Sequence, residues 1–248
     1  MPVYTRYLEN SVKKGKMPRH IGIILDGNRR FAKKMGLDYY RSYRLGAKKV
    51  EEVLGWLDDL GIEHVTLYVF STENFDRPKD QVEAIMKVLE EQLENLLNDL
   101  DRLRRSGIRF RAIGRLEMLP NSIRRLISEL EDRTKEFGER TLNIAVAYGG
   151  RREIVDSVRK IAEKVLKGEL RPEEIDEKVI REHLYAPDLP DPDLIIRTSG
   201  EERLSNFLLW QSAYSELYFC EAYLPEFRKV DLLRAIRNYQ RRERRYGR

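Results

Sequence analysis

Short apolar runs alternate along this chain with longer stretches in which apolar residues recur every three or four positions. The short runs are typical of buried strands, and the periodic stretches are typical of amphipathic helices. The runs cover 21–25, 65–70, 108–113, 142–147 and 194–196, with a weaker sixth candidate at 216–220. The periodic stretches cover 50–60, 82–103, 121–137 and 151–166. Strands that alternate with helices leave few architectures open.

This alternation predicts an α/β fold, with about six strands in a mostly parallel sheet flanked by helices. We expect 1–248 to form a single domain, with 1–17 as an N-terminal extension and 241–248 as a C-terminal tail. A domain of this size buries roughly three quarters of its unfolded surface. Its core therefore needs no disulfide or structural metal. Asn121 and the run Pro172–Glu174 supply helix-start signals.

Composition restricts the compartment more than the function. The single cysteine, Cys220, excludes an intrachain disulfide and a cysteine-based zinc site, and it fits a reducing compartment. No apolar run approaches the roughly 20 residues of a membrane span, and the first residues lack the apolar region of a secretory signal. We therefore expect a cytoplasmic protein. The net charge is +5, from 47 Lys+Arg and 42 Asp+Glu. This mild excess is compatible with nucleic acid, a membrane surface or a polyanionic small molecule as the binding partner.

Polar residues that could bind an anion follow three of the expected strands. In parallel sheets ligands bind beyond the carboxyl ends of the strands, so these segments are the candidates for a site. The first is Asp26-Gly27-Asn28-Arg29-Arg30. A carboxylate there could hold Mg2+, and guanidinium groups could grip phosphate oxygens. Taken alone, this segment could also be an Asp-Gly turn with surface arginines.

Two further strand ends carry the same kinds of donor. Ser71 to Pro78 follows the second run, and Arg197 to Asn206 follows the fifth, with Glu216 beyond it. The first of these could be no more than a capped helix start. Three strand ends that all carry phosphate donors make coincidence much less probable than any one of them does. The set predicts a site for a metal and a diphosphate.

Five segments resemble the signature regions of the undecaprenyl (or dehydrodolichyl) diphosphate synthase family, the cis-prenyltransferases. They are HIGIILDGNRRFAKK (20–34), TLYVFSTENFDRP (66–78), LNIAVAYGGRREI (142–154), DLIIRTSGEERLSNFLLWQSAYSELYF (193–219) and RRERRYG (241–247). They stand in family order, and the resemblance extends from about 18 to 247. The double arginine of DGNRR is closer to archaeal or eukaryotic members than to bacterial ones.

The resemblance implies the reaction. Isopentenyl diphosphate is added repeatedly in cis to an allylic diphosphate starter, geranylgeranyl or farnesyl diphosphate, to give a long polyprenyl diphosphate. This product is the precursor of a glycosyl-carrier lipid. The implied cofactor is Mg2+, the implied assembly is a homodimer, and product release implies contact with a membrane surface at its cytosolic face. Nucleic acid is not an expected partner.

The resemblance also implies roles for individual residues. Asp26 and Asn74 are the implied catalytic residues, and Asp26 and Glu216 the implied metal ligands. Arg245 and Gly247 would reach across a dimer to the partner's site. The implied substrate-binding residues are Gly27, Asn28, Arg29, Arg30, Phe31, Ser71, Thr72, Glu73, Phe75, Arg77, Arg197, Arg203, Leu204, Ser205, Arg245 and Gly247.

The chemistry explains these residue types. An allylic diphosphate loses pyrophosphate, so negative charge grows on the leaving oxygen, and Mg2+ and fixed donors stabilise it. No protein nucleophile is required, and His20, His64 and His183 match no triad. A neutral amide is a very weak base, so we interpret Asn74 as positioning a phosphate or water while a substrate phosphate takes the proton.

The growing hydrocarbon needs an apolar space. The leucine-rich stretch 82–103 could line a hydrophobic tunnel, as the corresponding helix does in the family, although ordinary core packing would give the same pattern. We expect Val69, Ile85, Leu89 and Leu93 to include tunnel positions that limit product length.

Two positions depart from the family pattern. Tyr43 stands near a position where the family commonly has His, so Arg41 or Arg44 could act as diphosphate ligand there. Glu202 occupies a position often held by His in bacterial members.

Four alternative assignments each have their own sequence requirements. An all-helical trans-prenyltransferase would need DDxxD motifs, which Asp58-Asp59-Leu60-Gly61-Ile62 does not complete. A related enzyme could transfer the prenyl group to a different acceptor, because the altered Tyr43 region could admit another nucleophile. Nucleic-acid binding through the C-terminal arginines lacks a reading helix or an aromatic platform. A non-catalytic scaffold subunit would not need Asp26.

Overall fold

The structure is a computed structural model that describes residues 2–242. Its centre is a six-stranded sheet in the order β3-β4-β2-β1-β5-β6, and every neighbouring pair is parallel. The strands are β1 (His20–Ile24), β2 (His64–Ser71), β3 (Ile108–Ile113), β4 (Arg140–Tyr148), β5 (Leu194–Arg197) and β6 (Glu216–Phe219). The predicted six-stranded α/β sheet is therefore confirmed, and within the described residues it is parallel throughout.

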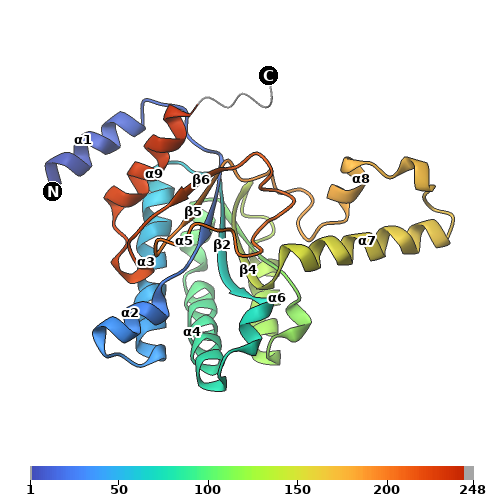
Figure 1. The fold of residues 1–248 in the computed structure, drawn as a ribbon, viewed down its shortest axis with the longest axis horizontal. Coiled ribbons are helices and arrows are strands. Elements are labelled where there is room, and N and C mark those ends of the chain that lie inside the picture. The colour runs from blue at the N-terminus through green and yellow to red at the C-terminus, as the bar shows by residue number, and fades with distance from the viewer. Residues whose placement is uncertain (1, 243–248) are drawn as a thin grey trace.

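Helices follow most of the strands (Figure 1). The α-helices are α1 (Pro2–Val12), α2 (Asn28–Met35), α3 (Tyr39–Asp59), α4 (Lys79–Asn98), α5 (Leu100–Arg105), α6 (Asn121–Thr134), α7 (Gly150–Leu166), α8 (Glu177–Glu182) and α9 (Lys229–Arg241). The 3-10 turns are η1 (Thr72–Asp76), η2 (Leu116–Met118), η3 (Pro172–Glu174) and η4 (Leu224–Glu226). None of the helices in residues 2–242 is long and apolar enough to cross a membrane.

The two faces of the sheet are covered differently. Successive side chains of a strand point to opposite faces. Ile23 and Leu67 therefore lie on one face of the sheet, and Ile24 and Tyr68 lie on the other. The first face belongs to the large core, which also includes residues of α3, α4, α6 and α9. The second face packs against a smaller cluster with Phe207 and Leu208 from the segment after β5. Irregular chain after β5 therefore contributes to the packing on that face.

Three local structures differ from the sequence expectation. The periodic stretch 82–103 is broken at Asp99, which separates α4 from α5 and adopts a non-helical backbone conformation. The run Pro172–Glu174 forms only a 3-10 turn. The extension at 1–17 contains α1, whose Leu8 and Val12 are buried in the large core. Gln240 on α9 donates to the Val12 carbonyl, so the two ends of the described chain pack together.

Candidate active site

The three predicted anion-binding segments meet beyond the carboxyl ends of β1, β2 and β5. β1 lies between β2 and β5 in the sheet, so the residues that follow these strands are neighbours. A cavity of about 730 Å³ opens among them. Eleven of the predicted residues line it, namely Asp26, Gly27, Asn28, Arg29, Arg30, Ser71, Asn74, Arg77, Arg197, Arg203 and Ser205.

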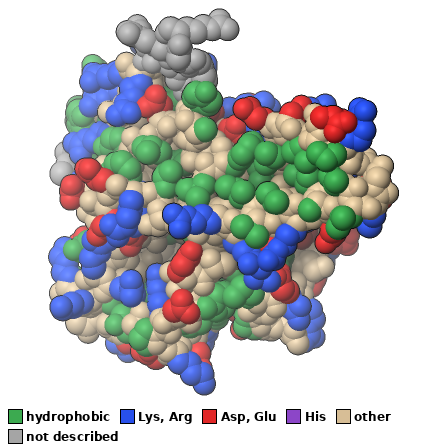
Figure 2. All heavy atoms as spheres, turned by 45° about the vertical axis from the view of Figure 1, so that its right-hand side comes forward, with side chains coloured by type: hydrophobic (Ala, Val, Ile, Leu, Met, Phe, Trp, Pro, Cys, Tyr) green, Lys and Arg blue, Asp and Glu red, His purple; other side chains and the backbone are tan. Residues whose placement is uncertain are grey.

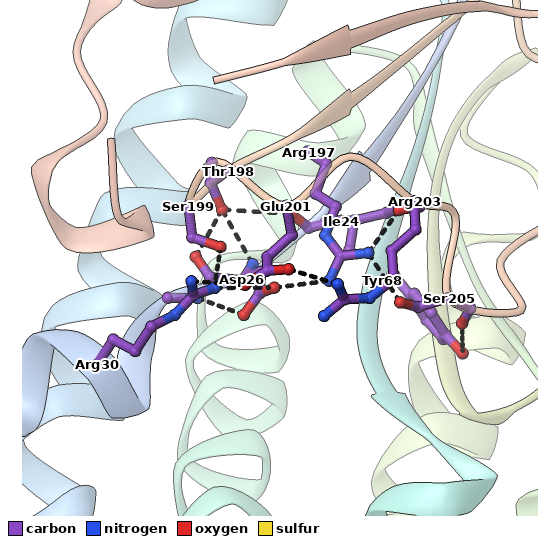
Figure 3. Close-up of polar contacts among 11 residues, drawn as sticks. Ile24, Asp26, Arg30, Tyr68, Arg197, Thr198, Ser199, Glu201, Arg203 and Ser205 are labelled. Atoms are coloured by element: carbon purple, nitrogen blue, oxygen red, sulfur yellow. Dashed lines mark hydrogen bonds and ion pairs between the residues drawn. The ribbon is translucent and has the colours of Figure 1, made fainter. Parts of the chain in front are cut away.

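Asp26 is held by hydrogen bonds to residues of β5, of the loop after β5 and of α2, and to the Gly27 amide (Figure 3). Its Oδ2 accepts from Nη2 of Arg197 at 2.7 Å and from Nη2 of Arg30 at 3.4 Å. Its Oδ1 accepts from the Gly27 amide at 2.6 Å. The Thr198 hydroxyl accepts from the Asp26 amide at 2.9 Å, which ties the end of β1 to the end of β5.

These contacts keep the Asp26 carboxylate charged. Burial by itself would raise the pKa of Asp26, but hydrogen bonding and charge from Arg197, the Gly27 amide and the charge of Arg30 outweigh it and lower the pKa. Gly27 has a φ of 106°, which favours glycine because it lacks a Cβ. A Cβ there would also meet the Tyr223 backbone at 2.9 Å. Asp26 is thus an ionised carboxylate in a fixed orientation.

Arg197 connects the carboxylate to the following loop. Its side chain is 5% exposed, and its Nη1 donates to the Ser205 hydroxyl at 2.7 Å and to the Arg203 carbonyl. Its buried Nε has no hydrogen-bond partner in the described protein. A buried donor without an acceptor is costly. Arg197 is therefore set to donate to a further acceptor in the cavity.

Glu201 bridges two arginines of the site. Its Oε1 accepts from Arg30 at 2.8 Å and its Oε2 accepts from Arg203. Both arginines were predicted to bind substrate, whereas Glu201 was not singled out from the sequence. Glu201 is therefore the anionic partner of both arginines in this structure.

The segment after β2 brings the second group of donors. Arg77 lines the cavity, and burial followed by the nearby charge of Arg29 lowers its pKa. Two guanidinium groups close together in a half-buried cavity attract an anion. Asn74 caps the turn, since its Oδ1 accepts from the Ser71 amide at 3.1 Å.

Tyr43 is a cavity residue whose role the sequence left open. It is 6% exposed, and its buried hydroxyl has no hydrogen-bond partner in the described protein. Burial raises its pKa, although the charges of Arg77 and Arg29 beside it act in the opposite direction. Arginine has no acceptor, so the hydroxyl proton needs an acceptor from elsewhere. The suggested replacements are exposed, and Arg41 pairs with Asp38 while Arg44 pairs with Glu91.

Several predicted residues lie outside the cavity lining. Phe31 is buried in α2, and Phe75 packs edge to face against Phe70 at 4.8 Å between ring centroids. Leu204 packs against the smaller core cluster. Thr72 and Glu73 belong to η1, and Glu73 accepts from Asn206 at 2.8 Å. These five residues are not among those that line the cavity.

Glu216 does not meet Asp26 within one chain. It begins β6 opposite Leu194, which is the amino end of β5, whereas Asp26 follows the carboxyl end of β1. Its carboxylate accepts from Arg242 at 2.6 Å. The two implied metal ligands therefore lie apart within one chain, and a metal-binding role for Glu216 stays a prediction. Glu202 is exposed, and Arg245 and Gly247 lie outside the described residues.

The site also fits a magnesium ion that arrives with a diphosphate. Among residues 2–242 there is no cluster of three or more His, Cys, Asp or Glu that could hold a metal alone. Mg2+ commonly takes one or two protein carboxylates and fills its other positions with water and substrate phosphate. Asp26, charged and at the cavity wall, matches that requirement.

The inner part of the cavity is apolar. Val69, Ile85, Leu89 and Leu93, the four expected tunnel positions, all line it, with Val50 and Leu54 of α3. A second cavity of about 330 Å³ shares five lining residues with it, namely Glu51, Leu54, Gln92, Leu96 and Leu142. The two cavities adjoin between the sheet, α3 and α4. A further space, lined by apolar and polar residues together, therefore adjoins the apolar inner part of the larger cavity.

An arginine-rich mouth on a parallel α/β sheet, with an apolar inner cavity behind it, is the arrangement expected of an enzyme that acts on diphosphate esters of hydrocarbon chains. Residues 24–247 match the family described as "Putative undecaprenyl diphosphate synthase". The chain belongs to this family and is a polyprenyl diphosphate synthase of the cis-prenyltransferase class.

Known relatives agree with that assignment. A tritrans,polycis-undecaprenyl-diphosphate synthase (geranylgeranyl-diphosphate specific) from Methanopyrus kandleri is 56% identical over 246 residues, which are 99% of this chain and 90% of the relative. The enzyme of the same name from Methanocaldococcus jannaschii is 53% identical over 249 residues, covering 100% of this chain and 89% of the relative. Lavandulyl diphosphate synthase from Lavandula x intermedia, solved with dimethylallyl diphosphate, superimposes with a TM-score of 0.89 at 37% identity, covering 94% of this chain and 99% of that one.

Proposed function

We propose that this enzyme starts from geranylgeranyl diphosphate and adds isopentenyl diphosphate units in cis, with Mg2+ as cofactor. The observation that carries the proposal is that Asp26, Arg77 and Arg197 line one cavity whose inner wall is apolar. The starter is inferred from the names of the archaeal relatives, and farnesyl diphosphate is the next candidate. The glycosyl-carrier lipid is the proposed destination of the product.

The proposed roles divide the mouth of the cavity between two diphosphates. Asp26 binds the metal that accompanies the allylic diphosphate, and Gly27 to Arg30 hold that diphosphate. Arg197, Arg203 and Ser205 hold isopentenyl diphosphate, since Arg197 already orients the Ser205 hydroxyl at 2.7 Å. Diphosphate binding displaces Glu201 from Arg30 and Arg203. Mg2+ supplies positive charge at the leaving oxygen when it is bound.

The reaction then balances without a protein nucleophile. The C–O bond of the allylic diphosphate breaks, and pyrophosphate leaves with the electron pair. The double bond of isopentenyl diphosphate forms the new C–C bond, and a proton is lost to a phosphate oxygen. Arginine donors stabilise the charge that develops on the leaving group. Asn74, whose Oδ1 is occupied by the Ser71 amide, is proposed to position the η1 turn rather than to accept the proton.

We further propose a homodimer that contacts a membrane when it releases product. Figure 2 turns the side of α7 and α8 forward and shows hydrophobic side chains gathered in a band across that face. Val155 and Val158 of α7 are 43% and 53% exposed. Such a band suits contact with a second copy. Light scattering of the purified protein tests the assembly, and a monomer at all concentrations contradicts it. Sedimentation with liposomes tests the membrane contact.

The decisive experiment is incubation with labelled isopentenyl diphosphate, Mg2+ and each of three starters: geranyl, farnesyl and geranylgeranyl diphosphate. We expect the highest kcat/KM with geranylgeranyl diphosphate and long cis products by mass analysis. Excess EDTA should abolish turnover and Mg2+ should restore it. A tenfold preference for farnesyl diphosphate contradicts the proposed starter. Full activity in EDTA contradicts the proposed metal. Transfer to an acceptor other than isopentenyl diphosphate is the alternative that product analysis would reveal.

A further inference from the structure

We propose that Asn206 is a positioning residue that joins the loop holding isopentenyl diphosphate to the η1 turn after β2. The inference rests on the proposed roles of Arg203 and Ser205. It concerns a residue that lies outside the cavity lining.

Asn206 makes three hydrogen bonds to two other segments. Its Nδ2 donates to Oε1 of Glu73 in η1 at 2.8 Å. Its Oδ1 accepts from the Arg151 amide at 2.8 Å, and its carbonyl accepts from the Gly150 amide at 2.7 Å. Both amides belong to the first turn of α7, where backbone N–H groups have no partner within the helix. One side chain thus uses both ends of its amide to hold η1 and α7 at fixed positions.

The backbone around Asn206 needs this support. Ser205 and Asn206 have φ values of 47° and 68°, in the left-handed region that is rare for serine and more readily adopted by asparagine. The Tyr68 hydroxyl contacts the Ser205 carbonyl and the Tyr148 carbonyl, each at 3.2 Å. This conformation turns the Ser205 hydroxyl toward Arg197, as Figure 3 shows. Loss of the Asn206 contacts would let the loop relax and move Ser205 away.

Gly149 shows how closely the three segments approach. A Cβ at Gly149 would lie 2.8 Å from Nδ2 of Asn206 and 2.8 Å from Oγ1 of Thr72. Both side chains would have to shift to admit a Cβ, so the end of β4, the loop and η1 meet closely at this point. The junction is therefore a built feature of the fold and not an incidental surface contact.

The charge of Glu73 makes its contact with Asn206 strong. Burial alone would raise the pKa of Glu73, but hydrogen bonds from its own amide and from Ser71, Asn206 and Thr72 lower it. Hydrogen bonds to a charged acceptor are stronger than those between neutral groups. Glu73 was predicted from the family resemblance to bind substrate. Its position instead fits a role in holding the loop, one residue before Asn74.

A double-mutant cycle that exchanges the amide of Asn206 and the carboxylate of Glu73 tests the proposal. Asn206→Asp keeps the acceptor for the Arg151 amide but places a second carboxylate against Glu73. We expect at least a tenfold rise in KM for isopentenyl diphosphate, with KM for the starter changed less than twofold. Glu73→Gln alone should have a smaller effect. In the double variant the amide introduced by Glu73→Gln can donate to the carboxylate introduced by Asn206→Asp, so KM should return to within about threefold of the wild-type value. A purely structural defect would not be rescued in this way.

Three outcomes would overturn the proposal. They are an unchanged KM in Asn206→Asp, an equal rise in both KM values, or effects in the double variant that are only additive. If Asn206→Asp does not fold, Glu73→Ala decides, because Glu73 is exposed and lies outside the cavity lining. A raised KM for isopentenyl diphosphate then supports the proposal, and an unchanged one overturns it. Asn98→Asp, on the exposed surface of α4, is the matched control.

The same measurements separate this inference from the proposed function. A wild-type enzyme that does not condense isopentenyl diphosphate with any starter contradicts the function itself. An active wild-type enzyme with an unaffected Asn206→Asp variant contradicts only the role of Asn206.

Discussion

Asp26 and Arg197 are 171 residues apart in the chain, yet Oδ2 of the carboxylate and Nη2 of the guanidinium lie 2.7 Å apart. The contact forms because β1 and β5 are parallel neighbours and both residues stand at the ends of those strands. The Arg197 side chain is nearly fully buried and is shared between Asp26 and Ser205. One arginine therefore links the proposed metal ligand of the starter site to the proposed site for isopentenyl diphosphate.

We expect Asp26→Asn to lower kcat by roughly 10²–10³-fold, the loss typical when a group that stabilises developing charge is removed. The pKa of Asp26 is lowered in the fold, so the wild-type carboxylate should stay ionised throughout the neutral pH range. Single-condensation rates from pH 5 to 9 provide the measurement. Asp132→Asn, a change on the exposed surface of α6, should have no effect. An Asp26→Asn enzyme with near wild-type kcat would show that the carboxylate does not act in the reaction.

Tyr43→Phe should weaken diphosphate binding, because it removes a buried hydroxyl donor without another protein partner. A hydrogen bond to a charged group is worth about 1.5–3 kcal/mol, which corresponds to about 10- to 100-fold in kcat/KM for the starter. Tyr40→Phe is the matched control, since the Tyr40 hydroxyl donates to Glu91 and Tyr40 does not line the cavity. Equal small effects of both substitutions would rule out a special role for Tyr43.

Leu93→Ala should lengthen the products by at least one isoprene unit, because Leu93 lines the inner cavity near the second cavity. Removal of a buried leucine side chain costs about 2–5 kcal/mol of stability, so product lengths should be compared at a temperature where the variant is folded. Leu97→Ala on the same helix, outside the larger cavity's lining, controls for loss of packing. An unchanged product distribution from folded Leu93→Ala removes Leu93 from the length-limiting set.

His20 should make the fold sensitive to mild acid. Burial, opposed by a hydrogen bond to the Pro190 carbonyl and reinforced by His64, lowers its pKa from 6.5 to about 4. The unfolded chain therefore binds this proton first as pH falls. The contribution of neutral His20 to the free energy of unfolding is fully present above pH 6.5 and is lost progressively down to about pH 4.

The expected loss of unfolding free energy is roughly 3 kcal/mol. It is measured as the difference in unfolding free energy between wild type and His20→Gln across this pH range. A constant difference between wild type and His20→Gln at all pH values would contradict the assignment.

Sequence patterns predicted the elements well but not the breaks and joins between them. The six strands were found because apolar runs reveal strands that are buried on both faces. The break at Asp99 was missed because the apolar period continues across it. Asn206 and Gly149 were missed because their importance lies in contacts with other segments, and no local pattern reveals such contacts. A polar residue directly after the Arg203–Ser205 cluster was the only available signal for Asn206.

The sequence by itself determined the parallel α/β architecture, the family and the three groups of anion donors. Local chemistry decides these features, because strand burial and phosphate binding each require particular residue types in order along the chain. Only the tertiary structure decided which donors share one cavity, since that depends on strand order. It placed Tyr43 in the cavity, kept Glu216 at the opposite end of its strand from the Asp26 side of the sheet, and turned Glu73 toward Asn206. Each of these outcomes depends on the packing of residues distant in sequence.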